Sequence, residues 1–277
     1  ECSIPRNVGL GSSANFGIMI GTIINHLYNE GQIENKYLVQ IGRFATNTFY
    51  CKPSGLMNEC VCCVGGFIKV DFKDPNSPDI CKLNIDFSNF DYTLCSVNSN
   101  LIRSDNTVDY DAVPAEMIEV AHFFKKDVLR EVSFDEFMKN YRIVRARVGD
   151  RPALRALHFF KEEERVLEQS EALERGDFDT FLRLVRESGD STFKALQNIY
   201  PQGSRRCRNV GTAIVLSENY LGDDGVVKVN GGGFSGTMLA FVKTDRLKDY
   251  VAYMDSILGK GSCYVIHTRE QGAIRLL

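Results

Sequence analysis

The chain has 277 residues, of which 44% are hydrophobic and 25% charged, and its formal net charge is −3. This is the composition of an ordinary globular protein, and it excludes intrinsic disorder and fibrous repeats. Because 33 basic residues nearly balance 36 acidic ones, no basic surface is expected for nucleic acid or for an anionic membrane. Single hydrophobic cores stop growing at roughly 250–300 residues, so the length predicts one large domain or two interlocked ones.

Cysteine usage and hydropathy favour a cytoplasmic protein. The nine cysteines are odd in number and lack the regular spacing of a secreted disulfide framework. The longest apolar stretch, residues 16–27, contains Gly17, Asn25 and His26, which makes it too short and too polar to cross a bilayer. We therefore predict that this stretch is a buried helix.

The cluster of Cys60, Cys62 and Cys63 allows two interpretations. Thiolates are zinc ligands, but no second cysteine pair and no cysteine–histidine pair lies at the spacing that zinc sites use. Small thiols also pack well in a hydrophobic core. The second interpretation is favoured, and we expect these cysteines on a core helix.

The first third of the chain is predicted to contain a glycine turn, two helices and three strands. The turn covers residues 9–13 and leads into an apolar helix that ends at about Tyr28. An amphipathic helix follows over residues 35–49. β-Branched and aromatic residues, separated by Asp, Asn, Pro and Ser, then predict strands over residues 66–72, 82–87 and 92–98. These strands are typical of a meander or an antiparallel sheet.

The rest of the chain is helical first and mixed afterwards. Residues 111–221 have a helical pattern, with Gly176 ending one helix and Asp177 capping the next. The tail predicts a strand, a glycine loop, a strand, a helix and a strand, over residues 226–229, 231–236, 238–242, 245–258 and 263–267. This order of elements indicates the α+β class.

The first glycine loop has the pattern of a phosphate-binding site. It consists of Gly9, Leu10, Gly11, Ser12, Ser13 and Ala14. Glycines let backbone N–H groups approach an anion at a helix N-terminus, and the two serine hydroxyls add donors for phosphate and a ligand for magnesium. A dinucleotide-binding fold is disfavoured because no hydrophobic strand precedes the loop, and a Walker loop is excluded because no Gly-Lys-Ser/Thr follows. A structural turn without a ligand is the alternative.

A second glycine loop contains Gly231, Gly232 and Gly233 between two predicted strands. Three consecutive glycines are conformationally expensive and pack nothing. They indicate that the backbone closely approaches a ligand or another loop. A β-bulge or a tight turn is the alternative explanation.

Three segments resemble motifs of the GHMP small-molecule kinases in their order and approximate spacing. They are residues 9–14, residues 52–59 with the sequence Lys-Pro-Ser-Gly-Leu-Met-Asn-Glu, and residues 231–236 with the sequence Gly-Gly-Gly-Phe-Ser-Gly. The resemblance extends over nearly the whole chain, and it is closest to galactokinases. It implies the α+β GHMP kinase fold, with two interlocked α/β domains and a nucleotide cleft between them.

The resemblance also implies how the family's domains map onto the chain. Residues 1–98 would be the C-terminal part of the N-terminal, ATP-binding domain, and residues 99–277 the C-terminal domain. The family's sugar-recognition strand and its Glu-His-x-Asp motif would lie upstream of Glu1. The absence of an initiating methionine agrees with the expectation that a segment precedes the chain.

The implied activity is transfer of the γ-phosphoryl group of ATP to the anomeric hydroxyl of galactose, with Mg²⁺, by a cytoplasmic monomer. Residues 9–14 would bind the nucleotide, and residues 231–233 would support the phosphate loop. Ser13 and Thr46 occupy the positions that would hold the metal ion.

Gly55, Asn58 and Tyr110 would contact the sugar. Tyr110 has a second explanation, as a half-buried tyrosine that anchors the start of a helix. Asn58 stands where the family has an aspartate base, and Thr46 stands where it has a glutamate that holds the metal. An Asn amide orients a hydroxyl but cannot take its proton, and losing general-base assistance costs about 10²–10⁴-fold in rate.

These departures leave alternatives open. The chain is either an active kinase that relies on positioning and electrostatics or an impaired paralogue that binds nucleotide or sugar. A GHMP kinase for another sugar or for an isoprenoid alcohol is a third, weaker alternative. Glu59 is not expected to replace the missing base, because adjacent helical residues point roughly 100° apart.

Overall fold

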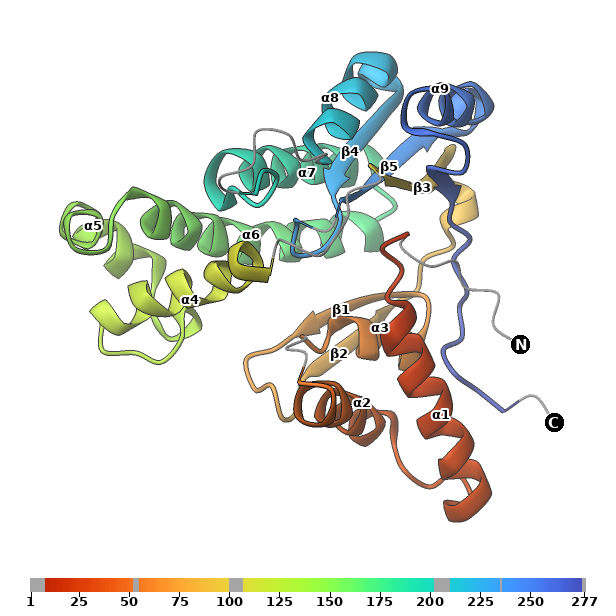
Figure 1. The fold of residues 1–277 in the computed structure, drawn as a ribbon, viewed down its shortest axis with the longest axis horizontal. Coiled ribbons are helices and arrows are strands. Elements are labelled where there is room, and N and C mark those ends of the chain that lie inside the picture. The colour runs from red at the N-terminus through yellow and green to blue at the C-terminus, as the bar shows by residue number, and fades with distance from the viewer. Residues whose placement is uncertain (1–7, 52–54, 100–106, 202–209, 235, 276–277) are drawn as a thin grey trace. The chain divides into compact units, whose positions relative to one another are not determined.

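The computed structural model describes residues 8–51, 55–99, 107–201, 210–234 and 236–275 (Figure 1). The chain divides into two compact units: unit 1 contains Glu1–Asn89 and His267–Leu277, and unit 2 contains Phe90–Ile266. The predicted division after residue 98 concerns the domains of the family and stays a prediction. The compact units divide earlier because strand β3 (Tyr92–Asn98) pairs inside unit 2.

Unit 1 combines three helices with a small sheet. Its helices are α1 (Ser12–Asn29), α2 (Asn35–Phe44) with its continuation as the π-helix η1 (Ala45–Phe49), and α3 (Met57–Val64). Strands β1 (Phe67–Asp71) and β2 (Asp79–Leu83) form an antiparallel pair, followed by the 3-10 turn η2 (Phe87–Asn89). The C-terminal segment joins this unit, since the Ala273 N–H donates to the Cys62 carbonyl at 2.9 Å.

The strand predictions for this region need two corrections. The strand predicted over residues 82–87 lies at Asp79–Leu83 instead, and β3 does not join the sheet of β1 and β2. The expected meander is therefore wrong, although the antiparallel pairing is confirmed. β3 pairs instead with β5 (Thr237–Lys243) and β6 (Cys263–Val265). Strands pair along edges that folding brings together, and these edges can belong to segments far apart in the sequence.

The helix predicted over residues 16–27 is confirmed, but its predicted burial is wrong. α1 buries only Ile18, Thr22 and Asn25, whereas Phe16 is 66% and Leu27 is 71% exposed. One face of α1 packs against α2 and α3. Among the described residues of unit 1, nothing covers the opposite face, although it is also apolar.

Unit 2 is built on a four-stranded antiparallel sheet with the strand order β4-β5-β3-β6, in which β4 covers Gly225–Val229. Helices α8 (Val210–Leu221) and α9 (Leu247–Leu258) share a hydrophobic core with these strands (Figure 1). Tyr250 and Met254 of α9 are completely buried there. The predicted order of strand, glycine loop, strand, helix and strand is confirmed.

The helical character predicted for residues 111–221 is confirmed for most of the described residues of that range, and residues 202–209 lie outside them. The helical part of unit 2 contains α4 (Thr107–Phe123), η4 (Leu129–Glu131), α5 (Phe134–Val148), α6 (Asp150–Glu174), α7 (Phe178–Ser191), η5 (Thr192–Leu196) and, after α8, η6 (Gly222–Asp224) and η7 (Thr244–Arg246). Asp177 caps α7 as predicted, since its carboxylate accepts a hydrogen bond from the Thr180 N–H at 3.0 Å. A second core joins α4, α5 and α6 around Phe137 and Val144.

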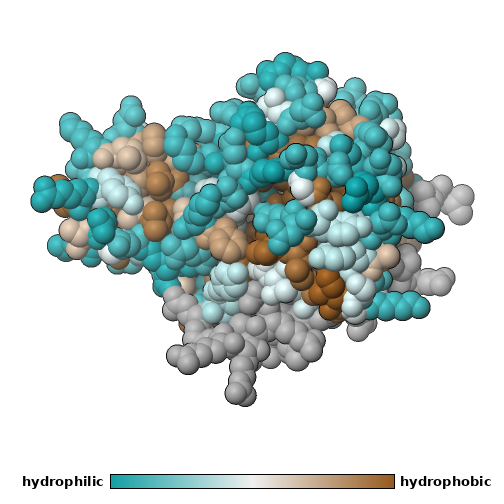
Figure 2. Space-filling view, turned by 90° about the horizontal axis from the view of Figure 1, so that it is seen from above, coloured by the Kyte–Doolittle hydropathy of each residue, from teal (hydrophilic) through white to brown (hydrophobic). Residues whose placement is uncertain are grey.

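One face of the surface is shown in Figure 2. Hydrophilic residues cover most of this face, and hydrophobic residues show between them in patches. Of the helices in the described parts of the chain, none is long and apolar enough to span a bilayer.

Candidate active site

The first glycine loop leads directly into the N-terminus of α1. Gly9 and Gly11 have φ values of +73° and +61°, a left-handed conformation that glycine adopts without a steric penalty. Gly11 is the N-cap, and its carbonyl accepts a hydrogen bond from the Asn15 N–H at 3.0 Å. The first N–H groups of a helix have no partner within the helix and carry the positive end of its dipole. Ser12 and Ser13, both exposed, therefore offer N–H groups and hydroxyls to an anion.

The loop and Asn58 lie side by side within unit 1. A Cβ atom placed on Gly11 would lie 3.0 Å from Cγ and 3.3 Å from Oδ1 of Asn58. Only glycine fits this position well, because a side chain would meet both a left-handed backbone and the Asn58 amide. Asn58 is exposed in the first turn of α3. The fold thus brings together two motifs that are far apart in the sequence.

Thr46 and Glu59 both lie near Gly42 of α2. The Thr46 hydroxyl donates to the Gly42 carbonyl at 3.0 Å. Glu59 is 3% exposed, and a Cβ atom placed on Gly42 would lie 3.4 Å from its Cγ. The Glu59 side chain is therefore buried where α3 packs on α2, which agrees with the expected orientation away from the exposed Asn58. Burial raises the pKa of Glu59, although its backbone N–H and Arg43 act in the opposite direction.

The oxygen donors at the loop are hydroxyl groups. In the described parts of the chain, no group of three or more His, Cys, Asp or Glu side chains is arranged to hold a metal ion. Mg²⁺ in phosphate sites uses few protein ligands and keeps phosphate oxygens and waters around it. Ser13 presents an exposed hydroxyl at the start of α1, whereas the Thr46 hydroxyl is bonded to the Gly42 carbonyl and carries no negative charge.

The cysteine cluster belongs to the core, as predicted. Cys60 and Cys63 are buried in a hydrophobic cluster that includes Val39. Burial raises the pKa of the Cys60 thiol to about 11 and that of the Cys63 thiol to about 12. Thiols that stay protonated are poor metal ligands and poor nucleophiles.

The second glycine loop packs against its own unit. A Cβ atom on Gly232 would lie 2.5 Å from Cε2 of Tyr110, and one on Gly233 would lie 2.3 Å from the Asn198 carbonyl oxygen. The Phe234 N–H donates to that carbonyl at 2.9 Å. Close approach to another segment of the chain therefore explains Gly232 and Gly233.

Four predicted positions remain to be placed: Gly231, Leu10 and Ala14 of the two glycine loops, and Gly55 of the second motif. Gly231 has a φ of +60° and no atom within 4 Å of an added Cβ, so its backbone conformation alone explains the glycine. Leu10 and Ala14 are half-buried, and Gly55 is exposed just before Leu56, the N-cap of α3. Residues 52–54, which belong to the second motif, lie outside the described residues.

The predicted site residues are distributed over both units. Unit 1 holds residues 9–14, Thr46, Gly55 and Asn58, and unit 2 holds Tyr110 and residues 231–233. Tyr110 is 44% exposed in the first turn of α4, which agrees with both of its explanations. Sequence reasoning missed Asn198, which is fully buried. No local pattern marks it, because its role depends on the contact with Gly233.

Comparisons with known proteins agree with this architecture. Residues 1–66 match the sequence model of the GHMP kinases N terminal domain. A galactokinase of Lactococcus lactis, complexed with galactose, is 21% identical with a TM-score of 0.77, over 97% of this chain and 68% of its own. A mevalonate kinase of L. major, in complex with R-mevalonate, is 13% identical with a TM-score of 0.59, over 96% and 67%. A D-glycero-D-manno-heptose 1-phosphate kinase of Bacteroides thetaiotaomicron is 12% identical with a TM-score of 0.53, over 94% and 60%.

The predicted fold class is confirmed by these matches. The chain has the GHMP kinase fold, and its first 66 residues match the N-terminal domain of that family. The chain spans about two thirds or less of the length of these solved structures. Because proteins with different named ligands share the fold, the fold alone does not select a substrate.

Proposed function

We propose that the chain is a GHMP-type phosphotransferase that transfers the γ-phosphoryl group of ATP to a sugar hydroxyl. The first substrate to test is galactose, whose anomeric hydroxyl would yield galactose 1-phosphate. The observation that carries the proposal is the contact between Gly11 and Asn58. It sets an anion-binding helix N-terminus beside an amide that can orient a hydroxyl, within one compact unit. The described cysteines are free thiols, which supports a cytoplasmic location.

The loop would act on the phosphates through its backbone. The N–H groups of Ser12 and Ser13 and the dipole of α1 are oriented before the reaction, so they stabilise developing charge without reorganising. Bound Mg²⁺ would neutralise charge on the phosphate oxygens, with the Ser13 hydroxyl as its protein ligand. Phosphoryl transfer passes through a loose transition state, for which positioning and electrostatics supply most of the catalysis.

Asn58 would position the acceptor hydroxyl and would not deprotonate it. Its Oδ1 accepts a hydrogen bond from a hydroxyl, but a neutral amide cannot hold the released proton. Glu59 does not fill the gap, because it is buried beside Gly42. The proposal therefore predicts a slow kinase, with a rate about 10²–10⁴-fold below that of an enzyme with a general base.

A second candidate is a protein that binds nucleotide or sugar without efficient transfer. It is favoured by Asn58 and Thr46, which replace both carboxylates of the family's pattern. Anion binding at the N-terminus of α1 needs neither carboxylate, so this function would survive their loss.

One experiment separates the two candidates. ADP release with ATP, Mg²⁺ and galactose is measured for the wild type, for the double variant Asn58→Asp/Thr46→Glu, and for Asn76→Asp. The last is the control, since it adds a charge at an exposed loop residue. Wild-type turnover that rises in the double variant alone supports the kinase, whereas nucleotide binding without turnover in any protein supports the second candidate. If ATP raises the melting temperature of none of them, the phosphate-binding role of the first loop is wrong.

A further inference from the structure

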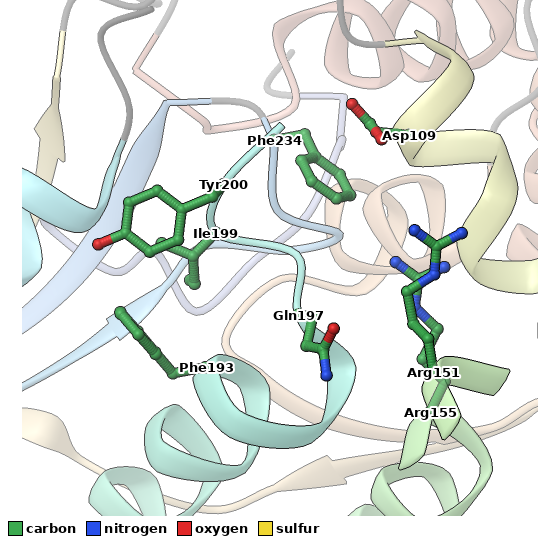
Figure 3. Close-up of a pocket in the computed structure, with 8 residues that line it drawn as sticks. All are labelled: Asp109, Arg151, Arg155, Phe193, Gln197, Ile199, Tyr200 and Phe234. Carbon is green, nitrogen blue, oxygen red and sulfur yellow. The ribbon is translucent and has the colours of Figure 1, made fainter. Parts of the chain in front are cut away.

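A pocket of about 230 Å³ lies within unit 2, apart from the residues assigned to phosphate or sugar (Figure 3). Arg151, Arg155 and Asp109 line it, and Glu116 forms ion pairs with both arginines. Two guanidinium groups thus lie with two carboxylates, so the charge of the pocket selects no class of ligand. The C-terminal segment, in contrast, contacts an element that carries the candidate active site.

Residues 267–275 lie against unit 1, although the strand before them, β6, belongs to unit 2. We call these residues the C-terminal strap. The Gly66 N–H donates to the Arg269 carbonyl at 2.7 Å, and the Lys82 ammonium group donates to the Glu270 carbonyl. The strap is therefore attached to unit 1 just before β1 and within β2.

The strap also completes the hydrogen bonds at the C-terminal end of α3. A helix leaves its last four carbonyl groups without partners inside the helix. In α3 these carbonyls, on residues 61–64, all accept a hydrogen bond from a neighbouring segment. The donors, in the order of the carbonyls, are the Gly65 N–H, the Ala273 N–H, the Asn35 amide and the Gly272 N–H. The two bonds from the strap measure 2.9 Å and 3.2 Å, so half of this helix end depends on the strap.

Glycine lets the strap pack on α3 backbone against backbone. A Cβ atom placed on Gly272 would overlap the carbonyl group of Cys63 and lie 2.7 Å from the carbonyl oxygen of Cys62. One placed on Gly65 would lie 2.8 Å from the carbonyl oxygen of Gln271. Such close approach of two main chains requires residues without a side chain. A larger residue at position 272 must therefore move the strap away from α3.

Cys62 connects the strap to the first glycine loop. Its carbonyl accepts the hydrogen bond from Ala273, and its Sγ atom accepts a weak one from Asn15 Nδ2 at 3.8 Å. The Asn15 N–H in turn donates to the Gly11 carbonyl at 3.0 Å. Because residues four apart lie on one face of a helix, Asn58 and Cys62 share the face of α3 that meets the start of α1.

We propose that the C-terminal strap sets the separation of Gly11 and Asn58, which makes Gly272 and Cys62 positioning residues of the candidate active site. The strap fixes one end of α3, and the helix carries a shift of this end to Asn58, roughly 9 Å away at 1.5 Å per residue. A misplacement of about 1 Å can cost about 10²-fold in rate. The inference rests on the proposed function, since the strap acts on the two residues whose contact carries that function.

The first variant is Gly272→Ala, and two properties of the full chain are measured. One is the NMR resonance of the Asn58 side-chain amide, observed with isotope-labelled asparagine and identified by its loss in Asn58→Asp. The other is kcat with ATP, Mg²⁺ and galactose, well below the melting temperature. We expect Gly272→Ala to shift the resonance and to lower kcat about tenfold or more, because transfer depends on exact positioning.

The matched control is Gly31→Ala, in the same unit but at the far end of α1. Gly31 has a φ of +76°, and an added Cβ atom would lie 2.6 Å from Cε1 of His26. The change therefore strains unit 1 away from the strap and α3. It should lower the melting temperature while the Asn58 resonance and kcat stay as in the wild type. A shift of the resonance as large as in Gly272→Ala would overturn the proposal.

A second variant, Cys62→Ala, removes the sulfur that Asn15 contacts and keeps the hydrogen bonds of the strap. It should shift the Asn58 resonance less than Gly272→Ala does, and it decides the question alone if Gly272→Ala fails to fold. An unmoved resonance in the folded variants, or a lower melting temperature with unchanged kcat in Gly272→Ala, overturns the proposal. If the wild type shows no turnover, the proposed function is wrong, and the resonance alone decides the role of the strap.

Discussion

Helix α1 of unit 1 has the more apolar sequence and helix α5 of unit 2 the more polar one, yet α5 buries its large side chains better. Phe137 and Val144 of α5 are 0% exposed, whereas Phe16 and Leu27 of α1 are 66% and 71% exposed. α5 faces a core that α4 and α6 complete. Among the described residues, the partners of α1 cover only one of its faces. Apolar composition therefore predicts a helix, but burial depends on which partners surround it.

The largest expected effect comes from a truncation in the core of unit 2. Phe137→Ala should lower the free energy of unfolding by about 3–5 kcal/mol, because it leaves a cavity that the surrounding helices fill only partly. The matched change Phe16→Ala on α1 should cost about 0.5 kcal/mol or less. Urea denaturation of both variants measures the difference. Similar losses would show that the comparison between the helices is wrong.

A second expected effect depends on pH and concerns buried polar groups of unit 2. Burial lowers the pKa of His158 to about 4, whereas an unfolded histidine titrates near 6.5. The unfolded state therefore binds more protons between these values, so stability is complete above about pH 6.5 and falls toward pH 4, by up to about 3 kcal/mol. His158→Gln should flatten this dependence in urea titrations at several pH values. The control His122→Gln, at an exposed position, should keep the loss of stability toward pH 4. If His158→Gln loses as much stability toward pH 4 as the wild type does, His158 is not the source of the pH dependence.

A third, smaller effect concerns the first glycine loop. Gly11→Ala should lower the free energy of unfolding by about 1–2 kcal/mol, because alanine is strained at a φ of +61° and its Cβ would press on Asn58. The control Gly17→Ala lies inside α1 with no atom within 4 Å of its Cβ, and it should stabilise the helix by about 0.5–1 kcal/mol. Thermal unfolding with and without ATP measures both. If ATP no longer raises the melting temperature of Gly17→Ala either, the loss in Gly11→Ala is not specific to the first glycine loop.

The smallest effect on stability is expected on the uncovered face of α1. Leu27→Glu should change the free energy of unfolding by about 0.5 kcal/mol or less, while it should reduce self-association, since exposed apolar patches promote contacts between molecules. Urea denaturation and light scattering at several protein concentrations check the two parts. A large destabilisation would mean that this face is covered in solution.

Much of the local structure follows from local signals. The left-handed glycine before α1 and the aspartate cap of α7 act on the few residues beside them, so Gly11 and Asp177 mark helix starts that a reader of the sequence can find. The expected orientation of Glu59 is also local, because helical geometry alone turns it away from Asn58. Local signals predict strand bounds less well. The strand predicted over residues 82–87 lies at Asp79–Leu83, because its bounds depend on its pairing with β1.

By itself, the sequence determined the α+β class, the order of elements, the two glycine loops and the absence of carboxylates at Asn58 and Thr46. Tertiary structure decided that Gly11 meets Asn58, that Gly233 packs on Asn198, that β3 joins β5 and β6, and that one apolar face of α1 stays uncovered. The physical reason is the distance along the chain over which each kind of interaction acts. Caps, turns and helical periodicity act over a few residues, whereas contacts, burial and strand pairing depend on segments that only folding brings together.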